Sequence, residues 1–303
     1  MSGPPDTSPP ATGGSGSTPV DPIHGRAGRN LPAAIAVGVG LGAYVVLTLV
    51  FWRFGFVLLI ALALALASVE LHNALRRVGM LAAVGPIVVG SVAIAIGSYL
   101  AGRQTPVVFS TTSVLLAALA LTVVASLVWR MRGGSEGYVR DTAASMLIIA
   151  YVPLLGSFSA LILAAPQDGV ARMITFLLVV VMNDTGGYVA GVLFGKHPMA
   201  PRISPKKSWE GFAGSVLFGT AAAALMAVYG LQAPVWVGVL LGLCLVAVAT
   251  CGDLVESLIK RDLGIKDMSS FLPGHGGVMD RLDSLLIAAP VAWLIMYILI
   301  PGG

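Results

Sequence analysis

The feature that most constrains this chain is a succession of long apolar segments. Nine of them follow one another, at residues 32–52, 54–69, 78–101, 106–129, 142–165, 170–194, 210–229, 233–251 and 285–300. A transmembrane helix needs about 20 predominantly apolar residues. Charged residues make up only 11% of the chain, whereas a soluble domain carries about 25%. The sequence therefore excludes a single soluble core and predicts an all-α, polytopic membrane protein with about nine transmembrane helices.

The second segment, residues 54–69, is short for a membrane span. Its boundary with the first segment, at Arg53, is not sharply marked. Two apolar segments in such close succession also suit a re-entrant pair, which enters the bilayer and returns on the same side. The sequence leaves both interpretations of residues 32–69 open.

The distribution of basic residues gives an independent check on the number of spans. If the N-terminus is cytoplasmic, fifteen of the eighteen Lys and Arg residues fall on the cytoplasmic side, and only Arg53, Arg103 and Arg172 fall on the other. Cytoplasmic loops of membrane proteins carry an excess of Lys and Arg. Omission of one span would destroy this alternation. The sequence thus favours nine spans, a cytoplasmic N-terminus and a C-terminus on the opposite side.

Three regions differ in composition. Residues 1–30 are rich in Pro, Gly, Ser and Thr and predict a disordered cytoplasmic arm. The arm lacks the basic-then-apolar order of a cleavable signal peptide, so we expect the first apolar segment to be retained. Residues 31–180 are expected to form an N-terminal transmembrane scaffold, and residues 181–303 a catalytic transmembrane region. The two cysteines, Cys244 and Cys251, lie roughly 10 Å apart along one expected helix, which is too far for a disulfide.

Glycines at four-residue spacing predict close contacts between helices. They occur in three spans, as Gly187, Gly191 and Gly195, as Gly38 and Gly42, and as Gly238 and Gly242. Small residues at this spacing let two helix backbones approach closely in lipid. We therefore assign these glycines to packing rather than to chemistry.

The segment 251–284 carries the strongest functional signal, because it holds six of the fourteen acidic residues. We interpret it as a long, charge-dense loop. Asp253 and Glu256 are three residues apart at the end of the eighth span, and Asp280 and Asp283 repeat this spacing at the start of the ninth. Hard divalent cations bind several such oxygens, often completed by water and substrate phosphate. The pattern indicates a metal site.

Surface salt bridges are the alternative interpretation of this segment, for example Glu256 with Lys260 one helical turn later. The high cost of carboxylates near hydrocarbon favours a functional role. In the run Pro273–Gly277, glycine amides can face a ligand, and a helix N-terminus follows, which suits a phosphate group. An ordinary turn remains possible there, and His275 could be a phosphate contact, a proton carrier or a turn residue.

A second basic feature lies before the seventh span, at residues 202–210. Ser204 and Pro205 predict a helix start there, with Ser as N-cap and Pro in the first position. Lys206 and Lys207 follow near the amino end of that helix. Positive charge at a helix N-terminus opposes the helix dipole, so an anionic partner would be favourable. Anchoring by the positive-inside rule explains the lysines equally well.

Asp184 lies within the sixth span, about ten residues or roughly 15 Å from its cytoplasmic end by helix rise. It shares a helix face with Gly187, Tyr188 and Gly191. An acid within the membrane suggests function, the alternative being a buried hydrogen-bonding residue. By contrast, we interpret Glu70, His72, Arg76 and Arg77 at the end of the second span as interfacial anchors that carry little information.

The polar motifs together resemble those of a known family. The run Ser257-x-x-Lys260-Arg261-x4-Lys266-Asp267, followed by Leu272-Pro273-x-His275-Gly276-Gly277-x-x-Asp280-Arg281-x-Asp283, resembles the signature of phosphatidate cytidylyltransferases without departure. Asp184-Thr185-Gly186-Gly187-Tyr188 and Ile203–Gly211 resemble its two upstream polar stretches. The likeness is dense over residues 180–285, and the arm 1–25 has no counterpart.

The resemblance implies that phosphatidate attacks the α-phosphorus of CTP, which gives CDP-diacylglycerol and pyrophosphate. It also implies Mg²⁺, alone or with a second cation such as K⁺, a homodimer in the bacterial plasma membrane, and no nucleic-acid partner. Metal ligation is expected from Asp253, Asp280, Glu256 and Asp283, and further catalytic roles from Lys260, Arg261 and His275. Substrate binding is expected from Ser204, Lys206, Lys207, Lys266, Gly276, Gly277, Arg281 and Asp184.

Within this set, the resemblance and the residue chemistry suggest a division of roles. Lys260, Arg261, Lys266 and the glycine amides would hold the triphosphate of CTP. Lys206 and Lys207 would hold the phosphatidate headgroup. Two other functions stay open: a CTP-dependent lipid kinase, which would transfer the γ-phosphate, and a secondary transporter that uses Asp184. A transporter predicts inverted repeats and polar residues at the midplane, whereas we find no repeat and the polar residues lie at one edge.

Overall fold

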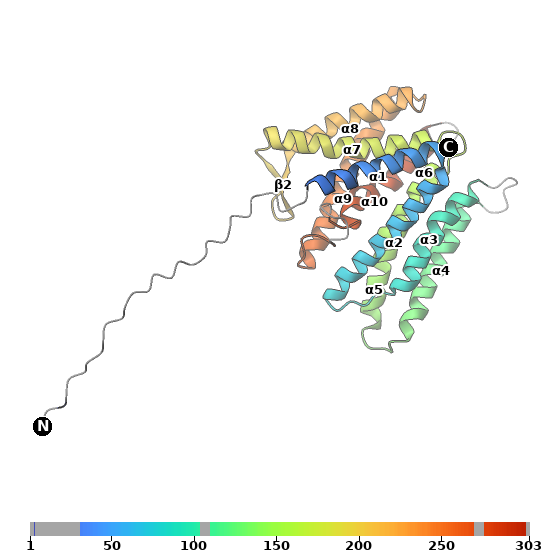
Figure 1. Ribbon diagram of the computed structural model, residues 1–303, viewed down its shortest axis with the longest axis vertical. Helices are drawn as coiled ribbons and strands as arrows, with labels where there is room; N and C mark the ends of the chain where they lie inside the picture. Colours follow the sequence, from blue (N-terminus) through green and yellow to red (C-terminus); the bar gives the residue numbers. More distant parts are fainter. Residues whose placement is uncertain (1–2, 4–30, 104–109, 270–275, 301–303) are drawn as a thin grey trace.

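The computed structural model describes Gly3 and residues 31–103, 110–269 and 276–300. Apart from Gly3, the predicted disordered arm lies outside these residues, and so do Pro273, Gly274 and His275 of the predicted phosphate-binding run. Figure 1 shows the arrangement of the helices. They are α1 (Leu31–Phe51), α2 (Arg53–Arg77), α3 (Val84–Ala101), α4 (Thr111–Met131), α5 (Tyr138–Ile149), the π-helical turn η1 (Ala150–Leu154), α6 (Leu155–Leu163), α7 (Gly169–Phe194), α8 (Trp209–Tyr229), α9 (Val235–Asp262) and α10 (Met279–Leu299).

The prediction of an all-α, polytopic membrane protein is confirmed. Among the described residues, eight helices are long and apolar enough to cross a membrane, with α5, η1 and α6 counted as one span over Tyr138–Leu163. The described part of α1, Gly38–Phe51, is a shorter apolar helix. Each of the nine predicted segments overlaps one of these spans.

The second span is longer than its apolar run suggests. Helix α2 continues to Arg77 and has 25 residues, or about 37 Å at 1.5 Å per residue. This length suits a full crossing and disfavours the re-entrant pair. The boundary near Arg53 is confirmed, because α1 ends at Phe51 and α2 begins at Arg53.

Loops that the basic residues assign to one side of the membrane lie together in space. At one end, the Asp141 carboxylate at the start of α5 accepts a hydrogen bond from the Leu81 amide (2.9 Å) and pairs with Arg130 of α4 (2.7 Å). At the other end, Arg172 in α7 donates to the carbonyl of Ile300, after α10 (3.2 Å). The contacts therefore agree with the predicted alternation of the spans.

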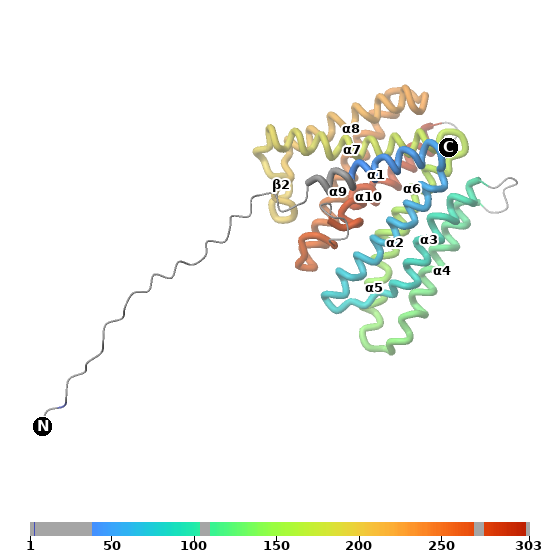
Figure 2. Tube along the Cα trace, in the orientation of Figure 1, coloured from blue at the N-terminus to red at the C-terminus, as the bar shows by residue number. Residues whose placement is uncertain are grey.

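Helices α7, α8, α9 and α10 pack in series, and α10 also contacts α6 and α2. In Figures 1 and 2, α7 and α8 run side by side, apart from the group formed by α2 to α5. A Cβ atom on Gly187 of α7 would lie 2.5 Å from Ser215 Oγ of α8. One on Gly238 of α9 would lie 2.6 Å from the Ala223 carbonyl. These close contacts confirm glycine packing for α7 and α9. They do not confirm it for Gly42 of α1, where a Cβ atom would meet no other part of the described chain within 4 Å.

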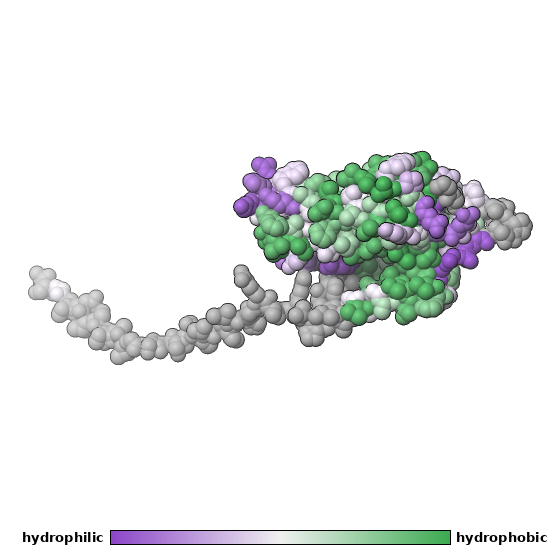
Figure 3. Space-filling view, turned by 90° about the horizontal axis from the view of Figure 1, so that it is seen from above, coloured by the Kyte–Doolittle hydropathy of each residue, from purple (hydrophilic) through white to green (hydrophobic). Residues whose placement is uncertain are grey.

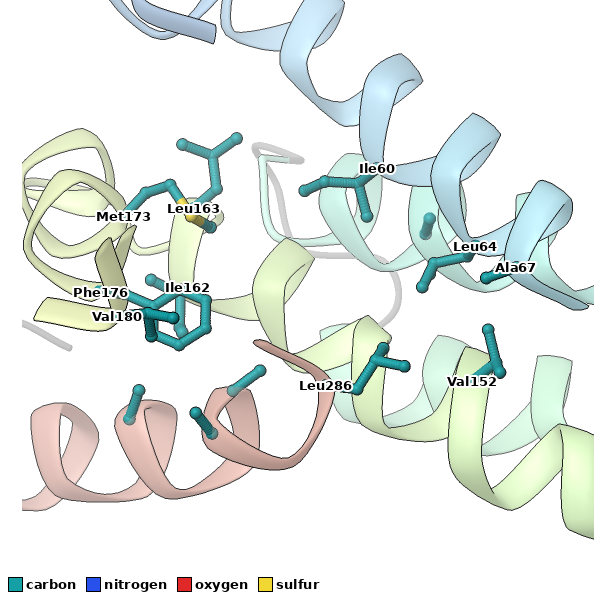
Figure 4. Close-up of a cluster of buried hydrophobic side chains, with 14 of the residues drawn as sticks. Ile60, Leu64, Ala67, Val152, Ile162, Leu163, Met173, Phe176, Val180 and Leu286 are labelled. Carbon is teal, nitrogen blue, oxygen red and sulfur yellow. The ribbon is translucent and has the colours of Figure 1, made fainter. Parts of the chain in front are cut away.

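The core joins the N-terminal helices to the C-terminal ones. Figure 4 shows Ile60 and Leu64 of α2, Phe176 of α7 and Leu286 of α10 converging on η1 and α6. Phe176 and Leu286 are almost completely buried. Many large hydrophobic side chains elsewhere remain exposed, and in Figure 3 they cover the middle of the visible face while hydrophilic residues gather toward its ends. Such a surface suits a lipid environment.

Two local predictions are wrong. Ser204 and Pro205 do not begin a helix: Ser204–Ser208 forms β2, which pairs with β1 (Pro198–Ala200) in a short antiparallel hairpin. The N-cap of α8 is Ser208, whose hydroxyl accepts a hydrogen bond from the Gly211 amide (3.1 Å). The segment from residue 251 is also not a loop at its start, because α9 continues to Asp262 and includes Asp253, Glu256 and Lys260.

Candidate active site

A cavity of about 300 Å³ opens between α7, the β hairpin, α8 and α9. Its polar lining includes Asp184 of α7, Lys206 and Lys207 of β2, and Asp253 of α9. The sequence places these residues in three separate motifs, and the fold brings them together around one cavity. The predicted face of Asp184, Gly187, Tyr188 and Gly191 lines the same cavity.

An ion pair connects the hairpin to α9 across this cavity. Lys207 Nζ lies 2.5 Å from Asp253 Oδ2. About a quarter of each side chain is exposed, 26% for Lys207 and 24% for Asp253, so both groups remain accessible to a ligand. Lys206 precedes Lys207 on β2 and is more exposed than Lys207. The two lysines therefore present one ion-paired cation and one exposed cation to the same cavity.

Asp184 lines the same cavity from α7. Its Oδ1 accepts a hydrogen bond from Asn183 Nδ2 (2.8 Å), and its carboxyl interacts electrostatically with Asp253, Lys207 and Arg281. The Asn183 carbonyl in turn accepts a hydrogen bond from Ser215 Oγ of α8 (2.7 Å). This network fixes the helix backbone on which Asp184 is carried.

A second charged cluster lies where α9 meets α10. Lys260 Nζ is 2.5 Å from Glu256 Oε2 and 3.0 Å from Asp280 Oδ1. The salt bridge between Glu256 and Lys260, which the sequence left as an alternative, is therefore present, and Asp280 joins it. Lys260 connects the two predicted carboxylate pairs because α9 extends far enough to carry it to the start of α10.

Backbone amides complete the surroundings of Asp280. Its Oδ2 accepts a hydrogen bond from the Gly277 amide (2.8 Å), and the Met268 amide donates to both oxygens (3.3 and 3.2 Å). Gly276 has φ +82°, which an L side chain rarely adopts. The Gly276–Gly277 turn, called the glycine turn below, thus folds back onto the first turn of α10. In this structure the Gly277 amide is directed at the Asp280 carboxylate.

The fourth predicted metal ligand, Asp283, follows on α10. Its Oδ1 accepts hydrogen bonds from the amide and hydroxyl of Ser284 (2.7 and 3.2 Å). The Asp283 carboxyl also interacts electrostatically with those of Asp253 and Glu256. The helices can approach so closely because position 252 is glycine, where a Cβ atom would lie 2.7 Å from the Asp283 carbonyl. All four predicted metal ligands therefore lie on one α9–α10 contact.

The remaining predicted site residues surround these clusters. Arg261 is exposed, and its Nε lies 3.5 Å from the Ile203 carbonyl of the hairpin. Lys266 is exposed in the segment after α9, and Arg281 is exposed on the first turn of α10. Ser204, at the start of β2, is not among the residues that line the cavity. His275 is outside the residues that the structure describes.

The sequence interpretation of Glu70 is wrong. This residue of α2 is only 6% exposed. Its carboxylate accepts hydrogen bonds from Ser269 Oγ (2.5 Å), the Val278 amide (3.0 Å) and the Met279 amide (2.8 Å). It therefore holds both ends of the segment that carries the glycine turn. In the sequence, the only sign of this contact is that Glu70 and the segment of the glycine turn are predicted to lie on the same side of the membrane.

Tyr151 is a further residue that sequence analysis missed. It lies on η1, a π-helical turn of a kind that often occurs at functional sites. Its hydroxyl is buried and has no hydrogen-bond partner among the described residues, and it interacts electrostatically with Glu256, Asp283 and Asp253. The fifth span thus closes the carboxylate cluster from the side of the N-terminal helices.

The donor set fits a hard cation. Glu256 Oε1 is buried and without a partner in the described part of the chain, and Asp253, Glu256 and Asp280 share two lysines. The described residues hold no group of three His, Cys, Asp or Glu that could bind a metal. Mg²⁺, however, is usually bound by one or two carboxylates together with water and substrate phosphates. Two carboxylates are therefore enough on the protein side, because water and substrate phosphates supply the other oxygens.

The chain matches the model of the cytidylyltransferase family over residues 32–299. It is 46% identical over 290 residues to a phosphatidate cytidylyltransferase of Mycobacterium leprae, with 90% of each chain covered. A phosphatidate cytidylyltransferase of Mycobacterium bovis is 39% identical over 287 residues, again over 90% of each chain. One of Aquifex aeolicus is 44% identical over 124 residues, which cover 41% of this chain and 46% of that protein. These matches confirm the resemblance that the motifs indicated.

Proposed function

Since the chain belongs to the cytidylyltransferase family, we propose that it catalyses the reaction named for its relatives, with CTP and phosphatidate as substrates. A phosphatidate oxygen attacks the α-phosphorus of CTP. The bond from that phosphorus to the bridging oxygen of the β-phosphate breaks, and pyrophosphate leaves. The lipid product is CDP-diacylglycerol, a phospholipid precursor.

The observation that carries this proposal is the cavity in which Lys206, Lys207 and Asp253 meet at the ends of apolar helices. A lipid phosphate lies at this level of a bilayer, and lysines bind phosphate as point charges. A second, apolar cavity of about 350 Å³ lies between α1, α2, α6, α7 and α10, and Arg281 is among its lining residues. Phosphatidate has an anionic headgroup, which suits the polar cavity, and two acyl chains, which suit the apolar one.

The reaction depends mostly on positioning and on neutralisation of charge. We assign Lys206 and Lys207 to the phosphatidate headgroup, and Lys260, Arg261 and Lys266 to the triphosphate. Asp253 and Asp280 would hold Mg²⁺, with Glu256 and Asp283 assisting directly or through water. When bound, the cation would neutralise phosphate charge that the lysines alone leave uncompensated. Asp184 supports Asp253 and Lys207 from within the membrane.

The sidedness and assembly of the enzyme are parts of the same proposal. The fifteen-to-three distribution of basic residues supports a site that faces the cytoplasm, where CTP is available. The family resemblance supports the bacterial plasma membrane as its location and a homodimer as its assembly.

The experiment that tests the proposal follows the phosphates of labelled CTP. Protein purified in detergent is supplied with phosphatidate, Mg²⁺ and CTP labelled at the α- or the γ-phosphate. We expect the α-label in a chloroform-soluble product, the γ-label in aqueous pyrophosphate, and no turnover in EDTA. Asp262→Asn, which changes an exposed carboxylate at the end of α9, serves as a control with unchanged activity.

Two results would contradict the proposal. Transfer of the γ-label to lipid would show a CTP-dependent lipid kinase. Absence of label transfer under any divalent metal, from protein that remains folded, would favour a non-enzymatic role such as transport. Activity that is undiminished in EDTA would show that the reaction needs no divalent metal. The metal site would then be wrong, but the proposed reaction would stand.

A further inference from the structure

Glu70 is the contact through which the N-terminal helices reach the catalytic segment. It lies near the end of α2, about 200 residues before its partners in the sequence, and its two carboxylate oxygens accept three hydrogen bonds. All three donors are neutral: the Ser269 hydroxyl and the backbone amides of Val278 and Met279. Each of these partners flanks the glycine turn or begins α10.

These bonds make Glu70 the N-terminal cap of α10. The first amides of a helix have no partner within the helix, and Val278, the N-cap residue of α10, provides no side-chain cap. Glu70 supplies one from another helix, with a negative charge that the helix dipole favours. A buried carboxylate is nevertheless a costly cap, since its desolvation must be compensated by these bonds.

The cap is directly coupled to Asp280. Gly277 donates to Asp280 while the next two amides donate to Glu70, so the two carboxylates divide three consecutive amides between them. A Cβ atom on Gly277 would lie 2.6 Å from Glu70 Oε2 and 3.0 Å from Asp280 Oδ2. The backbone at residue 277 is therefore held between the two acids. Displacement of the cap would move both the glycine amides and the Asp280 carboxylate.

We propose that Glu70 is a positioning residue, which acts through Ser269, Val278 and Met279 to hold the Gly276–Gly277 turn and Asp280 in the geometry that binds the triphosphate of CTP. This inference rests on the proposed function. Glu70 itself touches neither substrate nor metal in this scheme. Its effect is expected on the nucleotide side of the site, because the proposed contacts of the phosphatidate headgroup come from the β hairpin, α7 and α9.

The test compares Glu70→Ala, Glu70→Gln and Ser269→Ala with the control Glu136→Gln, which changes an exposed glutamate in the α4–α5 loop. The KM for CTP and for phosphatidate and the kcat are measured on folded protein isolated by size exclusion. Glu70→Ala is expected to raise the KM for CTP about tenfold or more, as small misplacements in a site do, with little change in the KM for phosphatidate. Glu70→Gln keeps one acceptor oxygen and Ser269→Ala removes one donor, so both should give smaller effects.

A second readout does not depend on activity. Hydrogen exchange of peptides covering residues 276–284 should become faster in Glu70→Ala and stay unchanged in Glu136→Gln. Unchanged exchange with an unchanged KM for CTP would overturn the inference. The inference would also be overturned if kcat fell only in proportion to the amount of folded protein, because the folded molecules would then be fully active. If the wild-type protein transfers no α-label, the proposed function fails, whereas the exchange data still decide whether Glu70 holds α10.

Discussion

Lys207 and Asp253 form an ion pair of 2.5 Å that joins the β hairpin to α9 across the cavity. Exposed ion pairs contribute little to stability, typically about 0–1 kcal/mol. This one lies where the proposed lipid phosphate and metal would each compete for one of its members. We therefore interpret it as a resting arrangement of two binding groups rather than as a structural clamp.

The lysines of β2 should differ in their effects. Lys206→Ala removes an exposed cation and is expected to raise the KM for phosphatidate alone. Lys207→Ala should raise that KM and also lower kcat, because it leaves Asp253 without its partner. Steady-state kinetics with both substrates varied will separate the two. A change confined to the KM for CTP would instead place these lysines on the nucleotide side.

The coupling of the pair can be measured directly. In a double-mutant cycle of Lys207→Ala and Asp253→Asn, the effects on kcat/KM should be non-additive, by about 0.5–3 kcal/mol for residues in contact. Lys206→Ala combined with Asp253→Asn provides the matched cycle, with a smaller coupling expected. Equal coupling in the two cycles would contradict the special role of the observed pair.

Asp280→Asn tests the cluster at the start of α10. The substitution keeps the size of the side chain but removes the charge that Lys260 and two backbone amides surround. We expect kcat to fall by far more than tenfold, a factor that corresponds to about 1.4 kcal/mol of barrier, in a protein that still folds and inserts. Asp262→Asn is the control. Retention of more than about a tenth of the wild-type kcat would show that Asp280 is not a metal ligand.

Gly252→Ala tests the close contact of α9 with α10. The new methyl group would lie 2.7 Å from the Asp283 carbonyl and 3.0 Å from Ser284 Cα, so the helices must separate. Overpacking of this kind costs about 1–3 kcal/mol. We expect a lower Tm in detergent together with reduced activity. Gly40→Ala on α1 is the control, because no other part of the chain that the structure describes would lie within 4 Å of its Cβ atom. A Tm that falls equally in both variants would refute the argument.

The sequence predicted the helices and much of the site because both follow from local rules. Long apolar runs require helices in a bilayer, and the i, i+3 spacing put Asp253 with Glu256, and Asp280 with Asp283, on the ends of two such helices. The motif near Ser204 was misread for an equally local reason. A serine followed by proline is a common helix start, but the backbone there pairs with residues 198–200, and no local pattern announces that pairing.

Glu70 shows where sequence reasoning stops. A single acid at the end of a span is most simply an anchor, and its partners Ser269, Val278 and Met279 lie about 200 residues away. Their proximity arises from the packing of α2 against α10, which depends on shape rather than on any periodicity. Tyr151 is similar, since an aromatic residue in an apolar span gives no sign that its hydroxyl will face carboxylates.

The orientation of the chain yields the last prediction. Arg76, Arg132 and Lys206 are exposed near one end of the helices, and Arg103 is exposed at the other. Single cysteines at these four positions, in a variant that lacks Cys244 and Cys251, should therefore all be reactive. If the basic residues mark the cytoplasmic side, an impermeant thiol reagent will label positions 76, 132 and 206 only from the cytoplasm, and position 103 only from outside. Labelling of 103 from the same side as 76 would break the nine-span order, because α3 alone separates the two positions. The reverse labelling of all four would keep the spans and invert the protein, which would place the lysine cavity on the side where CTP is absent and count against the proposed reaction.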